Sequence, residues 1–423
     1  MNLIPIADSV DMLFVKKDNF KTTTVSFNFY LPLVKENISE NALLAYLLSS
    51  CSERFKTFLE LNLKLNELYG AELTATVEKI GDAQHIRLAV SVIDDKYALD
   101  GESIIKEAVD MLMNLIFNPK VKENSFEKED VEREKRKLAE HISGEINDKR
   151  IYARGRLIEE MFENSPYGVS RYGTIEGLKA VDGKRLYNAW LRLLSDSYLR
   201  VQIVGSALPL GIEKIIAEKF NSLKRNVVFD CSNTTVLPCR EQVKIISDKM
   251  DVAQGKLVMG FSSKLSGHGA YALQVATDIF GGGPYSYLFE NVREKMSLCY
   301  YCSASPNKNK GFVMVDSGVE LQNVDKAKTE IINQLEKVKN GDFTDFVLSA
   351  SIKSITGALN SCNDSISALD VSYSKNIFGE ILSPEEIAEK ISLVTRDDVI
   401  EAAKGIKLHT IYELLPKGET NAN

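Results

Sequence analysis

The sequence has 423 residues, of which 44% are hydrophobic and 26% are charged, a composition typical of a globular protein with roughly two to three domains. Its 52 Lys and Arg residues are interleaved with 59 Asp and Glu residues, and this pattern excludes the basic stripe of a nucleic-acid-binding protein. The chain has no run of about 18 apolar residues, and its first residues lack a signal-peptide pattern. We therefore expect a cytoplasmic protein without a membrane span.

In chain order, the first half of the sequence combines short strand patterns with longer helical patterns. We predict strands at 10–15, 22–31, 72–80 and 84–92. We predict helices at 40–50, 55–69, 101–117, 123–146 and 149–162. Strands that follow one another directly, next to paired helices, favour antiparallel sheets with helices packed on one side.

The second half of the sequence repeats this order of elements. We predict strands at 242–247, 255–262, 298–304 and 311–319, and helices at 267–280, 284–295 and through most of 323–373. The halves also close alike, since EGLKAVDGKRLYNAWLRLL followed by YLRVQIVGS parallels EEIAEKISLVTRDDVIEAAKGI followed by LHTIYELLP. In each closing segment a residue suited to an N-cap, Asp182 or Thr395, precedes the longer helix.

The repeat predicts an α+β protein of two homologous domains, each an antiparallel sheet with helices packed mainly on one face. We place the first domain at 1–224 and the second at 242–423. Residues 225–241, which are rich in Asn, Ser, Thr and Pro, form the predicted linker.

The segment GGGPYSYLFENVREKMSLCYY, residues 281–301, carries the strongest cluster of unusual residues. A phosphate-binding loop would need a GxGxxG or GK[ST] pattern after a strand, and neither is present. A turn that ends one helix, with Pro284 beginning the next, explains the glycines more simply. Cys299 and Cys302 lack a second ligand pair, and the two-residue period of a strand would place them on opposite faces, so we predict core packing for both.

The half-chain repeat, SPYGVSRYGTIEGLKAV followed by YLRVQIVGS, and the YSYLFENVREKMSLCYY segment resemble the M16 peptidases, the family of mitochondrial processing peptidase and insulin-degrading enzyme. The resemblance covers nearly the whole chain. In that family a glycine-rich turn precedes a helix ending in Arg, and a Tyr follows seven residues later. The corresponding residues are Gly281, Gly282 and Gly283 in the turn, with Arg293 and Tyr300.

The resemblance implies that Arg293 and Tyr300 hold the main chain of a peptide. The chemistry agrees, because an Arg fork and a phenol can donate to backbone carbonyls or to a developing oxyanion. The alternative is structural: Arg293 pairs with Glu290 or Glu294, and Tyr300 packs in the sheet.

The sequence departs from the family at the zinc motif. Catalytic members carry His-x-x-Glu-His on the first long helix, where the two His bind zinc and the Glu polarises a water molecule. In ENALLAYLLSSCSERF the corresponding positions hold Ala42, Ala45 and Tyr46, and the first 84 residues contain no His. We therefore expect no metal in this chain, and zinc in a partner chain.

Other catalytic patterns are absent from the sequence. The four His residues are dispersed, and no pair has the i, i+4 spacing of a helical metal site. His141 falls where the family's third ligand region would lie, but a solvated helix face is the simpler interpretation. There is also no GxSxG nucleophile motif.

Family precedent therefore implies a non-catalytic, peptide-binding subunit of a heterodimeric zinc endopeptidase, which supplies the glycine-rich loop and clamp to a zinc-bearing M16 paralogue. The substrate would be a peptide or an unfolded polypeptide. The phrase LNELYGAEL is similar to the Firmicutes companion type that is associated with elongation factor P modification. A self-sufficient peptidase with an unrecognised site, a purely structural scaffold and a homodimer of the chain alone remain open.

Overall fold

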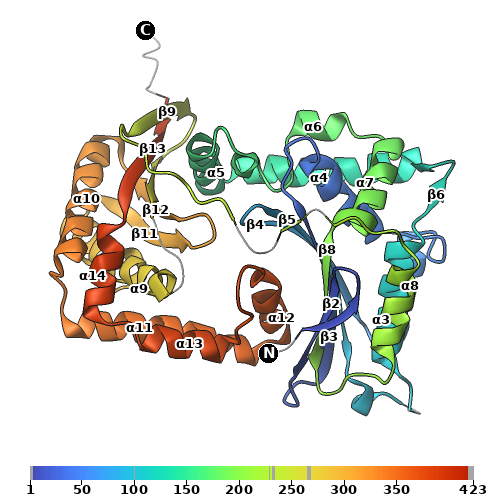
Figure 1. Cartoon of the computed structure of the whole chain (residues 1–423). Coiled ribbons are helices and arrows are strands. Elements are labelled where there is room, and N and C mark those ends of the chain that lie inside the picture. Colours follow the sequence, from blue (N-terminus) through green and yellow to red (C-terminus); the bar gives the residue numbers. More distant parts are fainter. Residues whose placement is uncertain (1–2, 100, 228, 231–233, 264–267, 418–423) are drawn as a thin grey trace, which may run out of the picture. The chain divides into compact units, whose positions relative to one another are not determined.

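The computed structural model describes residues 3–99, 101–227, 229–230, 234–263 and 268–417 (Figure 1). The chain forms two compact units, and neither is continuous in sequence. Unit 1 consists of Met1–Ser143, Val169–Asn233 and Cys362–Ser383. Unit 2 consists of Gly144–Gly168, Thr234–Ser361 and Pro384–Asn423.

Unit 1 contains a sheet with the strand order β1-β2-β8-β3-β5-β4. The strands are β1 (Ile4–Ala7), β2 (Val10–Lys16), β3 (Thr22–Pro32), β4 (Glu72–Ile80), β5 (Ala83–Ile93) and β8 (Tyr198–Gly205), with a small hairpin of β6 (Val121–Lys122) and β7 (Ser125–Phe126). The helices are α1 (Ile38–Leu48), α2 (Phe58–Glu67), α3 (Ile104–Phe117), α4 (Lys128–Asn147, whose last turn enters unit 2), α6 (Ile175–Lys179), α7 (Gly183–Asp196), α8 (Ile212–Asn221) and α12 (Ile366–Lys375).

Unit 2 contains a sheet with the strand order β11-β12-β10-β13-β9. The strands are β9 (Lys244–Met250), β10 (Gly255–Ser262), β11 (Cys299–Asn307), β12 (Phe312–Val319) and β13 (Lys407–Pro416). The helices are α5 (Lys149–Met161), α9 (His268–Gly281), α10 (Val324–Asn340), α11 (Asp345–Ser361), α13 (Pro384–Ser392), α14 (Arg396–Lys404) and a π-helix, η3 (Leu288–Lys295).

The two sheets have the same topology, which confirms the predicted α+β fold of homologous domains. The order β2-β8-β3-β5-β4 in unit 1 matches β9-β13-β10-β12-β11 in unit 2. One detail differs from the prediction, because each sheet is mixed: β2 pairs with β8, and β9 with β13, in parallel. The two strands of each parallel pair are separated in sequence by most of their half of the chain. A connection of this length permits parallel pairing.

The faces of the unit 1 sheet differ in polarity because side chains alternate along each strand. Val25, Phe27 and Phe29 of β3 point to one face and join the main hydrophobic core with residues of α1, α3 and α7. Ser26 and Asn28 point to the other face, where they are also fully buried. Figure 1 shows α12 on one side of β2 and β3, and α3 and α8 on the other.

A buried carboxylate on α12 ties this helix to the polar face of the sheet. Asp370 has no exposed surface and accepts hydrogen bonds from Nε and Nη2 of Arg87, at 2.8 and 2.5 Å. Its other oxygen accepts from Ser26 Oγ at 2.7 Å and from Gln202 Nε2 at 3.0 Å. A charge buried this deeply is tolerated because it is both paired and hydrogen-bonded.

Further polar groups of the sheet bind the backbone of α12. The Tyr30 hydroxyl donates to the carbonyl of Ser374 at 2.6 Å, and Arg200 donates to the carbonyl of Tyr373 at 3.1 Å.

His85 stacks on Tyr30 with the ring centroids 4.7 Å apart. Burial, aided by neighbouring cations, lowers the pKa of His85 to about 3, so the ring is neutral at neutral pH.

Helix α5 has the matching place in unit 2. It packs on β10 and β13, where Met161 lies against Gly260, on the face opposite the core formed with α9, α10 and α14. Arg156 of α5 pairs with Asp248 at 3.4 Å, and Asp248 also accepts from the Tyr412 hydroxyl at 2.8 Å. Figure 1 shows α10 and α14 on one side of β13 and α5 on the other.

Each sheet is thus covered, on the face opposite its main core, by a helix that the other half of the sequence supplies. The division into halves at 1–224 and 242–423 describes the sequence repeat and stays a prediction, as does the linker, part of which lies outside the described residues. The compact units differ from these halves because α5 and α12 are exchanged. Apart from α5 and α12, the helices described above that contact a sheet pack on its core face, as predicted.

Local signals set the starts of α7 and α14 where the sequence predicted them. Asp182 accepts from the backbone N–H of Arg185 at the start of α7, and Thr395 forms a capping box with Asp398 at the start of α14. The structure also contains β1 and α8, which the sequence patterns had not indicated.

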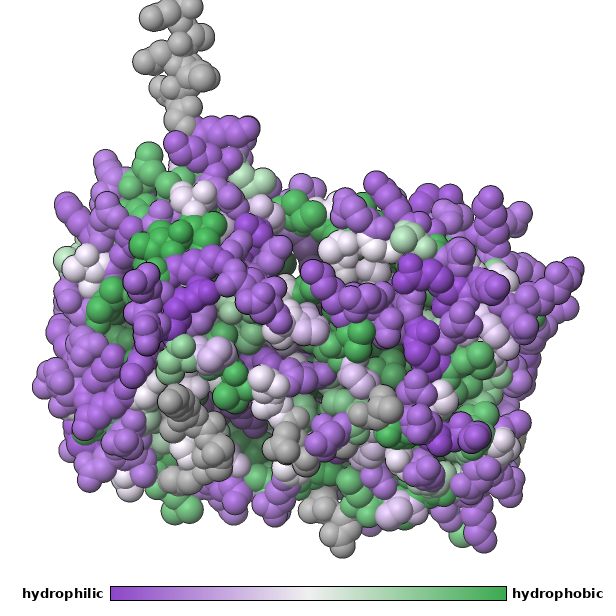
Figure 2. All heavy atoms as spheres, turned by 45° about the horizontal axis from the view of Figure 1, so that its top comes forward, coloured by the Kyte–Doolittle hydropathy of each residue, from purple (hydrophilic) through white to green (hydrophobic). Residues whose placement is uncertain are grey.

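Hydrophilic residues cover most of the face shown in Figure 2, with hydrophobic residues scattered between them. Within the described part of the chain, the apolar stretches of the helices are too short to span a bilayer.

Candidate functional site

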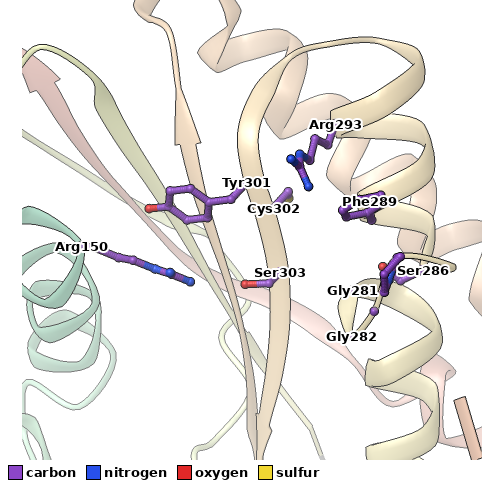
Figure 3. Close-up of a pocket in the computed structure, with 11 residues that line it drawn as sticks. Arg150, Gly281, Gly282, Ser286, Phe289, Arg293, Tyr301, Cys302 and Ser303 are labelled. Atoms are coloured by element: carbon purple, nitrogen blue, oxygen red, sulfur yellow. The ribbon is translucent and has the colours of Figure 1, made fainter. Parts of the chain in front are cut away.

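A pocket of about 330 Å³ lies in unit 2 at the segment that the sequence singled out (Figure 3). Edge strand β11 contributes one wall, and the turn after α9 contributes another. The lining residues are Gly281, Gly282, Gly283, Pro284 and Ser286 of the turn, Phe289 and Arg293 of η3, Tyr301, Cys302 and Ser303 of β11, and Arg150 of α5.

The glycines of the turn are required by close packing. A Cβ at Gly281 would lie 2.7 Å from the backbone nitrogen of Ala304 in β11, and a Cβ at Gly282 would lie 2.1 Å from the Asp278 carboxylate. Real Cβ contacts are longer, so a larger residue at Gly281 would push the turn away from the strand, and one at Gly282 would displace Asp278 of α9. The turn therefore sits against β11 because it lacks side chains.

The helix expected to begin at Pro284 begins instead at Leu288, and it is a π-helix. A separate turn precedes it, in which Ser286 N–H donates to the carbonyl of Gly283 at 2.9 Å. At the end of the helix, Met296 N–H reaches the carbonyl of Asn291, five residues back. Such wide turns are uncommon and often occur at functional sites.

Arg293 projects from η3 toward β11 (Figure 3). Its guanidinium lies 4.7 Å from the centre of the Phe289 ring, four residues earlier on the same helix. Its Nε is 3.5 Å from the carboxylate of Glu294, a long contact between two partly exposed side chains. The surface pairing foreseen for Arg293 is therefore present but weak.

A β-bulge separates the two tyrosines of β11. Cys299 pairs with Val319 and Tyr301 with Gly318, so Tyr300 is the extra residue. Tyr300 is 61% exposed, and its hydroxyl donates to Glu320 at 3.1 Å, which raises the pKa of Tyr300. Tyr301, and not Tyr300, is among the residues that line the pocket beside Arg293.

The bulge also corrects the expectation for Cys299 and Cys302. Without it, the two side chains would lie on opposite faces, but the extra residue brings both into the same buried core cluster. A hydrogen bond from the Cys302 thiol lowers the pKa of Cys299, and the same contact raises the pKa of Cys302. The prediction of core packing is confirmed, and the prediction of opposite faces is wrong.

Arg150 approaches the pocket from α5. Its Nε donates to Asp316 of β12 at 2.5 Å, and its guanidinium lies 4.4 Å from the centre of the Tyr301 ring. The Tyr301 hydroxyl donates to the same carboxylate at 3.3 Å. Burial is the main cause of the raised pKa of Tyr301, so the phenol stays protonated.

The positions of the family's zinc motif lie in unit 1. Ala42 and Ala45 of α1 are fully buried in the hydrophobic core. Tyr46 lies at the edge of this core, and its ring centroid is 6.4 Å from that of Tyr172. The methyl groups of Ala42 and Ala45 cannot coordinate zinc, and the single phenol of Tyr46 does not make a zinc site, so this set of residues does not fit the metal.

His141 is near this place but faces an aromatic partner. Its Nε2 lies 3.2 Å from the Tyr172 hydroxyl, and the two rings meet edge to face. Tyr172 therefore neighbours both Tyr46 and His141. Across the ranges that the structure describes, no three His, Cys, Asp or Glu side chains gather where they could hold a metal ion.

Sequence reasoning had placed Arg293 and the three glycines in one site, and the structure brings them together in one pocket. It had missed Arg150, Ser286, Phe289 and Tyr301. Arg150 is distant in sequence, and no local signal marked it. Tyr301 was next to the residue singled out, and only a strand bulge decides which of the two faces the pocket. The clamp role of Arg293, Tyr300 and the glycines stays a prediction.

Comparisons with known proteins define the class of this chain. Residues 180–355 match the family described as Peptidase M16 inactive domain. The chain is 30% identical, over 97% of its length and 96% of the relative, to the probable inactive metalloprotease YmfF of Bacillus subtilis. It is 21% identical, over 68% of its length and 69% of the relative, to an uncharacterized zinc protease of Rickettsia bellii.

Solved structures agree in fold. A conserved protein from Enterococcus faecalis superposes with a TM-score of 0.90 at 25% identity, covering 99% of each chain. A protease from Helicobacter pylori superposes with a TM-score of 0.81 at 14% identity, covering 98% of this chain and 99% of the other. The chain thus belongs to the M16 peptidase family, among its inactive metalloprotease-like members.

Proposed function

We propose that the chain is a non-catalytic, peptide-binding subunit of a two-chain M16-type zinc endopeptidase. It binds a peptide or an unfolded polypeptide in the cytoplasm, and a zinc-bearing M16 paralogue cleaves it. The observation that carries the proposal is the contrast between the two units. Two of the three zinc-motif positions in one unit are buried alanines, whereas the other unit has an Arg-lined pocket beside an edge strand.

The pocket is suited to the main chain of a peptide. Strand β11 is at the edge of its sheet, so its outer backbone groups can pair with an extended segment. Arg293 lies beside this strand, and its guanidinium can donate to main-chain carbonyls whatever the side chains of the peptide are. Tyr300 extends from the same strand into solvent.

A site composed from two chains is physically sound. A catalytic group needs a defined position relative to the scissile bond, and either chain can supply that position. The family identity of this chain supports such a role, because a member without zinc ligands can still bind and orient the substrate.

Co-expression with a zinc-bearing M16 paralogue from the same source tests the proposal. We expect the two chains to elute together in size-exclusion chromatography. We also expect the pair to cleave an unstructured peptide at least about 10-fold faster than the paralogue alone, since binding contributes to kcat/KM.

Co-elution with no gain in cleavage would favour a structural scaffold. Cleavage by the chain alone would favour a self-sufficient peptidase. Separate elution together with unchanged cleavage would contradict the proposal outright.

A further inference from the structure

The lining of the pocket is rich in hydrogen-bond donors and positive charge. It includes two arginines, Arg150 and Arg293, and the hydroxyls of Ser286 and Ser303. Among the residues that the structure describes, no Asp or Glu lines the pocket. A main-chain carbonyl can accept these hydrogen bonds, and an anion would in addition balance the positive charge.

The fork of Arg293 is available to a ligand. Its ion pair with the adjacent Glu294 joins Nε to the carboxylate at 3.5 Å, so this contact does not use the two terminal NH2 groups of the guanidinium. The Phe289 ring supports one side of the guanidinium, which holds a planar group in place at little entropic cost. Two parallel N–H groups of a guanidinium match the two oxygens of a carboxylate.

A buried hydroxyl in the pocket has an unmet hydrogen-bonding requirement. Ser286 is 1% exposed, and its Oγ makes no hydrogen bond with any residue that the structure describes. A buried hydroxyl without a partner costs roughly 1–3 kcal/mol, and such groups in native proteins call for an explanation. Ser286 lines the pocket, so an oxygen of a bound ligand that reaches its Oγ would supply the missing partner.

Arg150 contributes less charge than Arg293. Asp316 accepts from its Nε at 2.5 Å, so much of its charge is balanced within the protein. Its guanidinium lies over the Tyr301 ring. Arg293 is therefore the principal anion-binding group, and the rings of Phe289 and Tyr301 give the pocket apolar surfaces suited to an organic acid.

We propose that this pocket binds a carboxylate of the peptide, held by Arg293 and Ser286. The inference rests on the proposed peptide-binding function and specifies the substrate class. The carboxylate is either the free C-terminus of a peptide or an Asp or Glu side chain, since both present the same two oxygens.

Fluorescence anisotropy of the full chain with four labelled hexapeptides distinguishes these sources. The first peptide ends in a free acid and the second in an amide. The third and fourth are amides with a central Glu or Gln. We expect the free acid or the Glu peptide to bind at least about 10-fold more tightly than its neutral counterpart, as for a charge-assisted pair of hydrogen bonds.

Variants of the full chain connect this preference to the pocket. Arg293→Ala should abolish it, and Ser286→Ala should reduce it. Arg154→Ala should retain it, because Arg154 is an exposed arginine of α5 that does not line the pocket. Thermal melting of each variant identifies any loss of folding, and Arg293→Gln, which keeps the length of the side chain, replaces Arg293→Ala if that variant is unstable.

Equal binding of acid and neutral peptides would overturn the inference and leave the peptide-binding function intact. A preference that survives in Arg293→Ala and in Arg293→Gln would also overturn it. If inorganic phosphate displaces the labelled peptide better than acetate does at equal concentration, the assignment to a carboxylate is overturned in favour of a different anion. If none of the four peptides binds, both the inference and the peptide-binding part of the proposed function fail.

Discussion

Replacing Asp370 with Ala is expected to lower the free energy of unfolding by about 3–5 kcal/mol, the cost of removing one partner from a buried ion pair. The carboxylate has no exposed surface, and the Arg87 side chain that it binds is only 6% exposed. The substitution would leave the Arg87 charge buried without its partner, and it would also deprive Ser26 and Gln202 of their acceptor. Urea denaturation of the purified chain measures the loss.

The exposed pair of Asp110 and Arg54 provides a matched control. Its atoms are 2.6 Å apart, but its side chains are 67% and 49% exposed, so Asp110→Ala should cost about 0–1 kcal/mol. Hydrogen exchange should also be faster at the α12 amides of the Asp370→Ala variant, because that helix loses its tie to the sheet. Equal losses in the two variants would show that Asp370 does not hold α12 in place.

Arg293→Ala is expected to reduce kcat/KM of the assembled pair of chains by about 30- to 1000-fold. This loss corresponds to about 2–4 kcal/mol, the scale of one removed oxyanion donor. Lys295→Ala is the matched control, because Lys295 is a cation of the same helix that does not line the pocket. Steady-state cleavage of an unstructured peptide measures both variants. Undiminished cleavage with Arg293→Ala would contradict the clamp.

The phenol of the clamp can be assigned in the same assay. Tyr300 has the position that the family resemblance gives, and Tyr301 is the tyrosine of β11 that lines the same pocket as Arg293. A loss of activity in Tyr300→Phe supports the assignment by resemblance. A loss confined to Tyr301→Phe transfers the role to the phenol that lies beside Arg150 and Asp316.

Much of the fold could be predicted because its signals are local. The bounds of β4 and β10 agree with the predicted strands, and the helix starts at Asp182 and Thr395 agree with their capping residues. The repeated order of elements then predicted two domains of one topology.

The exchange of α5 and α12 could not be predicted from local patterns. In sequence, α5 lies within the first half and α12 within the second. Only long-range contacts, such as that of Asp370 with Arg87, 283 residues apart, assign each helix to the other unit. Periodicity identifies a helix but does not identify the sheet on which it packs.

The candidate site was predicted in part for the same reason. The glycines and Arg293 form a local pattern, whereas the facing of Tyr301, Cys299 and Cys302 depends on how β11 pairs with β12. One extra residue in a strand changes the face of every residue that follows. The loss of the zinc motif could be recognised from the sequence alone, because the first 84 residues contain no His.

The central claim is that the chain binds peptides without holding the metal that cleaves them. The most direct test is the zinc content of the purified full chain, measured by atomic emission together with peptide turnover in the same sample. We predict less than about 0.1 zinc per chain and no turnover, since Ala42 and Ala45 offer no ligand atoms. Stoichiometric zinc with turnover by the chain alone would contradict the claim.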